Sequence, residues 1–197
     1  MNFCLKNIPE GWAADWQQNA VSVSSSITRK GSDVSFGCLE FELDLNPVLL
    51  PDSLLMTGAA KMGDFMKKYP AVGLRSPVKA ENWLLCRIAK DDFLLIAIAS
   101  WRIFSGEILF CEKRVTVRFY GDGRPFAPEE SVPLEDIFIM RGGSEREVLD
   151  AYADFTATSH RVKLNLHCWR GWGTWDYYSA KFSDRSIREN LDELQKL

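Results

Sequence analysis

The sequence predicts a mainly β protein: an antiparallel β-sandwich, then a connecting helix, then one strand–helix unit. Three observations lead to this class. Short apolar runs separated by Gly, Pro, Asn and Asp recur up to residue 140, a spacing typical of sandwiches. A helix-capping pattern follows Gly142-Gly143. A Trp-rich extended run then precedes a second helical period. We therefore expect a sandwich domain over residues 1–140 and a C-terminal part over residues 141–197.

The composition is that of an ordinary globular protein, with 46% hydrophobic and 26% charged residues. A net charge of −3 and the lack of a basic cluster give no basis for binding nucleic acid or an anionic membrane surface. The N-terminal residues lack the pattern of a signal peptide. No apolar run reaches the roughly 20 residues that span a bilayer. We expect a cytoplasmic protein.

The residues that bind metals or form disulfides are sparse. The five cysteines are odd in number, widely spaced and without a Cys-x-x-Cys pair, which favours reduced thiols over a disulfide framework or a zinc site. The two histidines, His160 and His167, flank a run that reads as extended, so we do not expect them to share a metal. No cofactor and no metal site is predicted.

The first half of the sandwich gives uneven signals. Val21–Ser24 predicts a short strand, with Ser24–Ser26 as a surface connection. Residues 33–45 predict a strand whose apolar phase shifts by one position after Gly37, which predicts a β-bulge at this glycine. Residues 47–70 fit a short helix and an irregular loop equally well.

Residues 71–120 predict an antiparallel meander. Its strands are Trp83–Ala89, Phe93–Trp101, Ile108–Cys111 and Val115–Tyr120, with turns at residues 90–92 and at Ser105-Gly106. The second strand is apolar at nearly every position, so we expect it to be buried on both faces. The fourth alternates and is expected to be half-buried. A last strand over Leu134–Met140 completes the sandwich.

Two helices are predicted after the sandwich. Ser144-x-x-Glu147 is a capping box for a helix over residues 145–157, with Val148, Tyr152 and Phe155 on its inner face. Ser183 is a suitable N-cap for a helix that carries Ile187, Leu191 and Leu194 at helical spacing.

The run between these helices carries the functional signal. In an extended strand Trp172 and Thr174 point to one side and Trp175 to the other, beside two glycines. Asp176 falls where the strand should end. A carboxylate beside aromatic rings suits a sugar, because the carboxylate accepts hydroxyl hydrogen bonds and flat rings cover the apolar face of the pyranose.

The octapeptide Gly171-Trp172-Gly173-Thr174-Trp175-Asp176-Tyr177-Tyr178 resembles the first barrel strand of glycoside hydrolase family 36, the α-galactosidases and raffinose-synthase-like enzymes. Residues 143–153 are similar to the helix that enters that barrel. Gly173 departs from the family, which frequently has Cys there. The resemblance implies a large β-sandwich, a (β/α)8 barrel and a small C-terminal β domain. It also implies a retaining mechanism with two aspartates on later barrel strands, to which no residue here corresponds.

We therefore expect the chain to comprise the sandwich and the first βα unit of a truncated TIM barrel, and to be inactive alone. The truncation could arise in cloning, in setting the gene's boundaries or in nature, and the sequence leaves these alternatives open. Asp176 is expected to bind an oligosaccharide or galactoside, with Trp175, Trp172 and Tyr177 around it, although the tryptophans also fit a core. An uncovered βα unit would expose apolar side chains, so we expect it to fold back on the sandwich or to pair in a homo-oligomer.

A second function remains open from the sequence: a stand-alone carbohydrate-binding or assembly module with an aromatic patch on the sandwich. The adjacent acids Asp91-Asp92 and Glu129-Glu130 lie in turns or Pro-rich loops. We expect these pairs to be solvated rather than catalytic.

Overall fold

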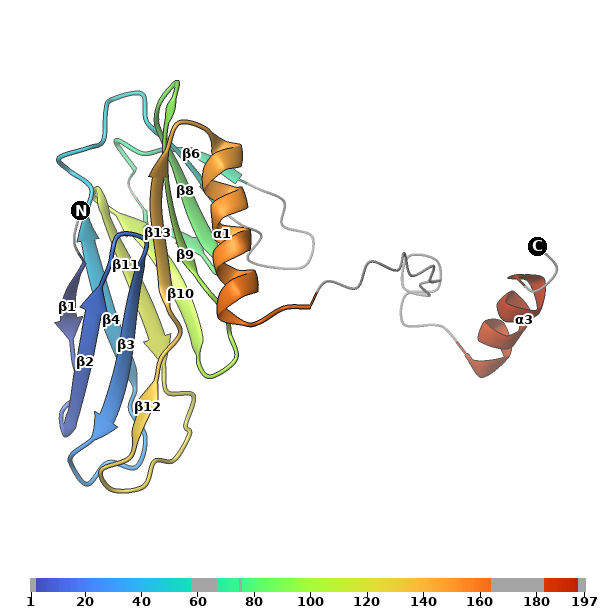
Figure 1. Cartoon of the computed structure of the whole chain (residues 1–197), viewed down its shortest axis with the longest axis horizontal. Helices are drawn as coiled ribbons and strands as arrows, with labels where there is room; N and C mark the ends of the chain where they lie inside the picture. The colour runs from blue at the N-terminus through green and yellow to red at the C-terminus, as the bar shows by residue number, and fades with distance from the viewer. Residues whose placement is uncertain (1–2, 58–66, 75, 164–182, 195–197) are drawn as a thin grey trace. The chain divides into compact units, whose positions relative to one another are not determined.

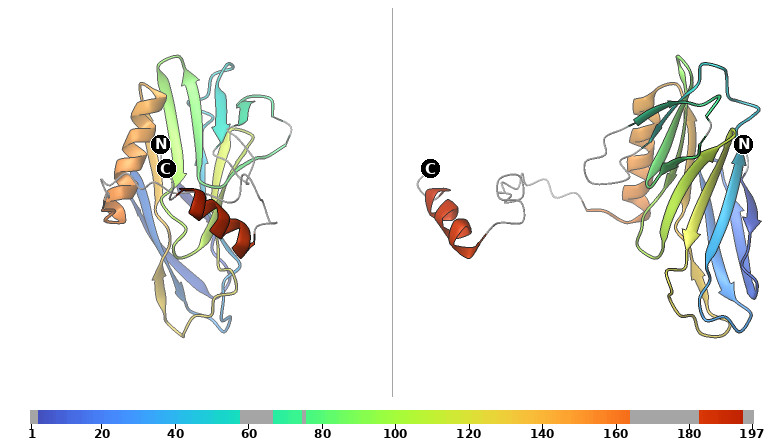
Figure 2. Two further views of the ribbon diagram at one scale, coloured as in Figure 1. Left: turned by 90° about the vertical axis from the view of Figure 1, so that its right-hand side faces the viewer. Right: turned by 180° about the vertical axis from the view of Figure 1, so that it is seen from behind.

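The structure is a computed structural model that describes residues 3–57, 67–74, 76–163 and 183–194. Contacts divide the chain into two compact units, Met1–Val162 and Lys163–Leu197. In the first unit two antiparallel sheets face each other across a hydrophobic core, as Figures 1 and 2 show. The predicted antiparallel β-sandwich is confirmed. The domain boundary expected after residue 140 stays a prediction.

The first sheet has five strands in the order β1-β4-β11-β10-β7. Strand β4 shows why these residues form a half-buried strand: Leu39, Phe41 and Leu43 are buried, whereas Glu40 and Glu42 are half-exposed. This alternation buries one face and leaves the other to solvent. The bounds are β1 Cys4–Asn7, β4 Cys38–Asp44, β7 Val78–Ala80, β10 Ser105–Cys111 and β11 Arg114–Tyr120.

The second sheet follows the order β12-β3-β13-β9-β8-β5-β6, with β2 paired along the other edge of β3. Strand β9 is buried on both faces, as predicted, because the sandwich core covers one face and helix α1 (Glu145–Ser159) covers the other (Figure 1). The bounds are β2 Trp12–Gln18, β3 Ser22–Arg29, β5 Leu54–Thr57, β6 Lys67–Pro70, β8 Trp83–Ala89, β9 Asp92–Ile98, β12 Ser131–Pro133 and β13 Ile137–Gly142.

The predicted bulge at Gly37 is wrong. Strand β4 begins one residue later, and its pairing with β11 runs without a shift from Cys38 to Asp44. The apolar phase changes because Phe36 belongs to a loop, where its ring packs edge-on against Trp12 at 5.5 Å. Gly121 makes room for this loop: a Cβ there would lie 2.1 Å from the carbonyl oxygen of Phe36.

Further boundaries differ from the sequence prediction, among them the end of β9, which lies at Ile98 rather than at Trp101. Residues Ser24–Ser26 are the middle of β3 rather than a connection, with Ser25 between the buried Val23 and Ile27. The described parts of residues 47–70 include two paired strands, β5 and β6, where a helix or a loop was expected. Ser105 opens β10 instead of forming a turn, and β13 begins at Ile137 rather than at residue 134.

The meander is only partly correct. Strands β8 and β9 form one antiparallel pair and β10 and β11 another. The loop from β9 to β10, however, crosses from one sheet to the other. Alternation within a strand does not indicate which sheet receives it, so the sequence did not distinguish a crossing from a hairpin.

Helix α1 begins as predicted and ends two residues later. The hydroxyl of Ser144 accepts from the backbone N–H of Glu147 at 3.1 Å, and the Glu147 carboxylate accepts from the backbone N–H of Gly143 at 2.8 Å. Val148 is fully buried against the second sheet, and Tyr152 and Phe155 pack beside it. The capping groups and this apolar face together fix α1 on the sandwich.

The second unit contains helix α3 (Asp184–Leu194), which confirms the helix predicted after Ser183. The hydroxyl of Ser183 accepts from the backbone N–H of Ser186 at 3.3 Å, and Arg185 pairs with Glu189 one turn later at 2.7 Å. Within the part of the chain that the structure describes, neither helix has the length and apolar character needed to cross a membrane.

Candidate ligand-binding site

The four residues predicted to bind a sugar, Trp172, Trp175, Asp176 and Tyr177, lie outside the described residues. His167 and the strand expected around them lie there too. Their assembly into a sugar site therefore stays a prediction. Among the described residues, a second candidate ligand site is a cavity at the C-terminal end of α1.

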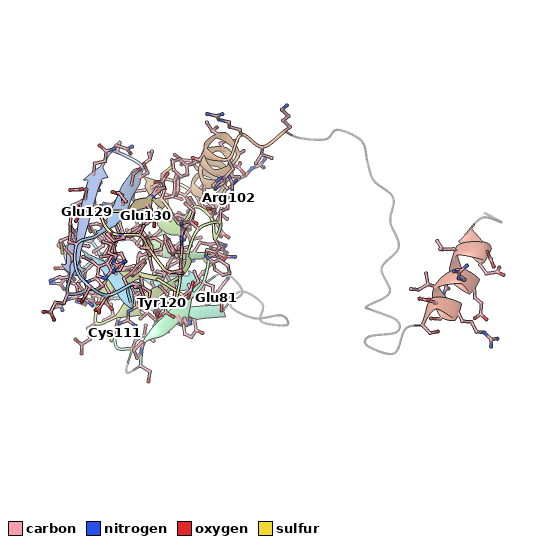
Figure 3. The ribbon with its side chains drawn as sticks, turned by 90° about the horizontal axis from the view of Figure 1, so that it is seen from below. Glu81, Arg102, Cys111, Tyr120, Glu129 and Glu130 are labelled. Carbon is pink, nitrogen blue, oxygen red and sulfur yellow. The ribbon has the colours of Figure 1, made fainter. Side chains whose placement is uncertain are left out.

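A cavity of about 450 Å³ lies where three chain segments meet. The segments are the loop from β9 to β10, the connection from β12 to β13 and the C-terminal end of α1. Figure 3 labels Arg102, which lies beside the end of this helix. The volume falls in the range of small-molecule sites. The lining residues are Ala99, Ser100, Arg102, Ile103, Pro133, Leu134, Glu135, Asp136, Ser159 and His160.

Glu135 fixes two of these walls to each other. Glu135 is only 4% exposed. Its carboxylate accepts hydrogen bonds from the backbone N–H groups of Ile103 at 2.5 Å and Phe104 at 3.4 Å. The hydroxyl of Ser100 donates to the same carboxylate. A buried carboxylate is tolerated when donors surround it, so the loop from β9 to β10 is held in one conformation.

His160 fixes the third wall. It is the C-cap of α1, and its backbone N–H donates to the Thr156 carbonyl at 3.0 Å. Its ring Nε2 lies 3.2 Å from the carbonyl oxygen of Ala99, and its Nδ1 lies 3.4 Å from Nη1 of Arg102. Since a carbonyl only accepts, we assign the ring hydrogen to Nε2, which leaves Nδ1 to accept from Arg102.

Several polar groups at the cavity are left for a ligand. Among the described residues, the half-buried carboxylate of Asp136 and the hydroxyl of Ser159 have no hydrogen-bond or ion-pair partner. Arg102 uses one of its five N–H groups on His160 and is otherwise exposed. The cavity thus offers a ligand one free acceptor, the carboxylate of Asp136, and free donors on Arg102 and Ser159, between segments that are held in place by hydrogen bonds.

A charged network lies on the outer face of the five-stranded sheet, and there, in contrast to the cavity, the central carboxylate is already bound by neighbouring side chains. The carboxylate of Glu107 lies 2.5 Å from Nζ of Lys79 and 3.4 Å from Nη1 of Arg118, and it accepts from the hydroxyl of Tyr120. Burial alone would raise the pKa of Glu107, but the hydrogen bonds from Lys79 and Tyr120 lower it below the ordinary value. These acceptors are engaged, so we assign the network a structural role.

In each adjacent acid pair at least one carboxylate binds a neighbouring residue. Asp92 pairs with Arg141 through two bonds of 2.6 Å, and the hydrogen bond from Arg141 lowers the pKa of Asp92. Glu129 and Glu130 are labelled in Figure 3. Glu129 pairs with Lys30, while Glu130 accepts from the backbone N–H of Ala127 at 2.7 Å. Within the described ranges, no three His, Cys, Asp or Glu residues are grouped so that they could hold a metal ion.

Few local patterns in the sequence indicate the cavity. Ser100 and Arg102 follow a buried strand, which is where loops carry function. Glu135 stands between Leu134 and Asp136, and a lone acid beside an apolar residue is a weak signal. Glu135 binds a loop that lies far earlier in the chain, and Ser100, for example, is 35 positions before it. No local sequence pattern encodes such a long-range contact.

Comparison with known proteins gives a distant likeness. No family model and no curated protein matches the chain. Among solved structures, the chain is similar to the galactosidase domain of the alpha-galactosidase–sucrose kinase AgaSK, with 12% sequence identity and a TM-score of 0.42. The match covers 72% of this chain and 23% of that one. The chain thus spans less than a quarter of the protein that it matches, and a likeness at this level establishes no activity for it.

Proposed function

We propose that this chain is the N-terminal portion of a glycoside hydrolase resembling the α-galactosidases and raffinose-synthase-like enzymes. The octapeptide Gly171–Tyr178 carries the proposal, because its Trp, Asp and Tyr residues resemble the first barrel strand of that family. The order of elements supports it: a sandwich, the capped helix α1, the octapeptide and then the capped helix α3. This is the order expected at the entrance to a (β/α)8 barrel.

In the longer enzyme the proposed reaction is retaining hydrolysis of α-galactosides. Such a reaction needs two carboxyl groups about 5 Å apart across the scissile bond, one as nucleophile and one as acid and base. We place both on later barrel strands. Asp176 would lie at the C-terminal mouth of the first strand and accept hydrogen bonds from sugar hydroxyls, with Trp172, Trp175 and Tyr177 around the ring.

The isolated chain is therefore expected to bind or position a galactoside at most, without hydrolysing it. Incubation of the pure 197-residue protein with an aryl α-galactoside tests this, with phenol release as the readout. We expect no turnover above that of buffer. Turnover that Asp176→Asn abolishes would show that the chain holds a complete active site and would refute the proposal.

A second candidate is a carbohydrate-binding or assembly module that acts without a barrel. Two exposed tryptophans of the sandwich favour it: Trp16 is 38% exposed and Trp101 is 48% exposed. Exposed aromatic rings can stack on sugars. Calorimetric titration with an oligosaccharide distinguishes the two, since this candidate requires binding that Trp16→Ala or Trp101→Ala removes, whereas the barrel proposal requires neither ring.

A further inference from the structure

We infer that the cavity at the end of α1 binds a neutral polyhydroxylated ligand of about one saccharide ring, held by Asp136, Arg102 and Ser159. This goes beyond the proposed function, because the cavity uses none of the residues from 169 to 178. The site is complete within the first compact unit.

The cavity is organised before any ligand arrives. Glu135 holds the loop from β9 to β10, and the backbone N–H of Ala99 donates to the carbonyl of Asp136 at 2.9 Å. His160 ties the end of α1 to the same loop. Because the three walls are fixed by contacts that the ligand does not replace, little conformational entropy is lost on binding.

The free polar groups match hydroxyls, which both donate and accept. Asp136 is a carboxylate without a partner in the described chain, so it accepts from a hydroxyl. The remaining N–H groups of Arg102 donate, and the hydroxyl of Ser159 does either. Ile103, 37% exposed, and the neighbouring Leu134 and Pro133 supply an apolar wall for the carbon face of a ring.

The charges at the cavity argue against an anion. The lining carries two carboxylates, those of Glu135 and Asp136, and one guanidinium, that of Arg102. The helix contributes its carbonyl end, which carries partial negative charge, and the last turn of α1 has no basic residue to offset it. A cation meets Arg102 at the same opening. A neutral ligand with several hydroxyls satisfies every free group without either conflict.

The test is a titration of the full 197-residue chain with galactose, followed by NMR of backbone amides. We expect shifts confined to the three lining segments. Asp136→Asn should weaken binding about tenfold, because a charge-assisted hydrogen bond is replaced by a neutral one, and Arg102→Gln should weaken it by several-fold. Asp91→Asn, at an exposed turn carboxylate, is the matched control and should leave the affinity unchanged.

Inorganic phosphate is the comparison ligand, and we expect it neither to shift these amides nor to compete with galactose. Three results would overturn the inference: no galactose binding at its highest usable concentration, galactose binding that Asp136→Asn leaves intact, or phosphate binding in place of galactose. The amide spectrum of each variant verifies its fold. The hydrolysis assay for the proposed function is independent, so either proposal can fail alone.

Discussion

The carboxylate of Glu135 lies 2.5 Å from the backbone nitrogen of Ile103, which joins the connection between β12 and β13 to the loop between β9 and β10. The two residues are 32 positions apart in the chain. The same carboxylate also accepts hydrogen bonds from the hydroxyl of Ser100 and from the backbone N–H of Phe104. One buried acid therefore sets the shape of the loop that crosses between the two sheets.

Replacement of Glu135 by Gln should destabilise the sandwich by about 1–3 kcal/mol, since one amide oxygen cannot serve the three donors that the carboxylate now binds. Urea unfolding of the variant and the parent protein measures the loss. Glu129→Gln is the control: its carboxylate pairs with Lys30 at an exposed position, where an ion pair contributes about 0–1 kcal/mol. Equal stability of the two variants would contradict the role given to Glu135.

Glu107 should make stability depend on pH. Its folded-state pKa lies below the ordinary value of 4.5, so its contribution is complete above that value and is lost as the pH falls through the folded pKa. Glu107→Gln should therefore cost about 1–3 kcal/mol near pH 7 and less at about pH 3. Unfolding curves at the two pH values measure this, and a loss that is the same at both would count against the ionised network with Lys79 and Arg118.

The N-cap of α1 offers a local test of the helix. Ser144→Ala should lower the free energy of unfolding by about 0.5–2 kcal/mol, because the backbone N–H of Glu147 loses its acceptor. Ser144→Asp should restore most of the loss, since its carboxylate accepts the same bond and suits the positive end of the helix dipole. Failure of Asp to restore stability would mean that the hydroxyl acts through some other contact.

The thiols should differ in reactivity. Burial, aided by Asp92, raises the pKa of Cys86 to about 12, and burial, aided by Glu40, raises that of Cys38 to about 11. Because the thiolate is the reacting form, both should resist iodoacetamide in the folded protein, whereas the exposed Cys4 should be alkylated before either of them. Peptide mass spectrometry after timed labelling reads the order, and early labelling of Cys86 would show that the core opens readily.

Much of the sandwich was predictable from local patterns. Strand β8 matches its predicted bounds, and α1 begins where the Ser144 capping box places it. These elements were predicted because their signals lie within a few residues. Phe36 misled the strand prediction, because a buried ring in a loop looks the same in sequence as one in a strand.

The cavity at the end of α1 was not predictable in this way. Ser100, Glu135 and His160 come from three distant segments, and only the packing of β9, β13 and α1 brings them together. The residues around Asp176 that are predicted to bind a sugar differ from the cavity in this respect. Their sequence signal is local and strong, but they lie outside the residues that the structure describes.

The coding DNA beyond the Leu197 codon tests the central claim most directly. If the chain is the N-terminal portion of a glycoside hydrolase, the source gene continues in frame into further alternating strands and helices, with aspartates at the ends of later strands. A stop codon directly after Leu197 in that gene would contradict the account.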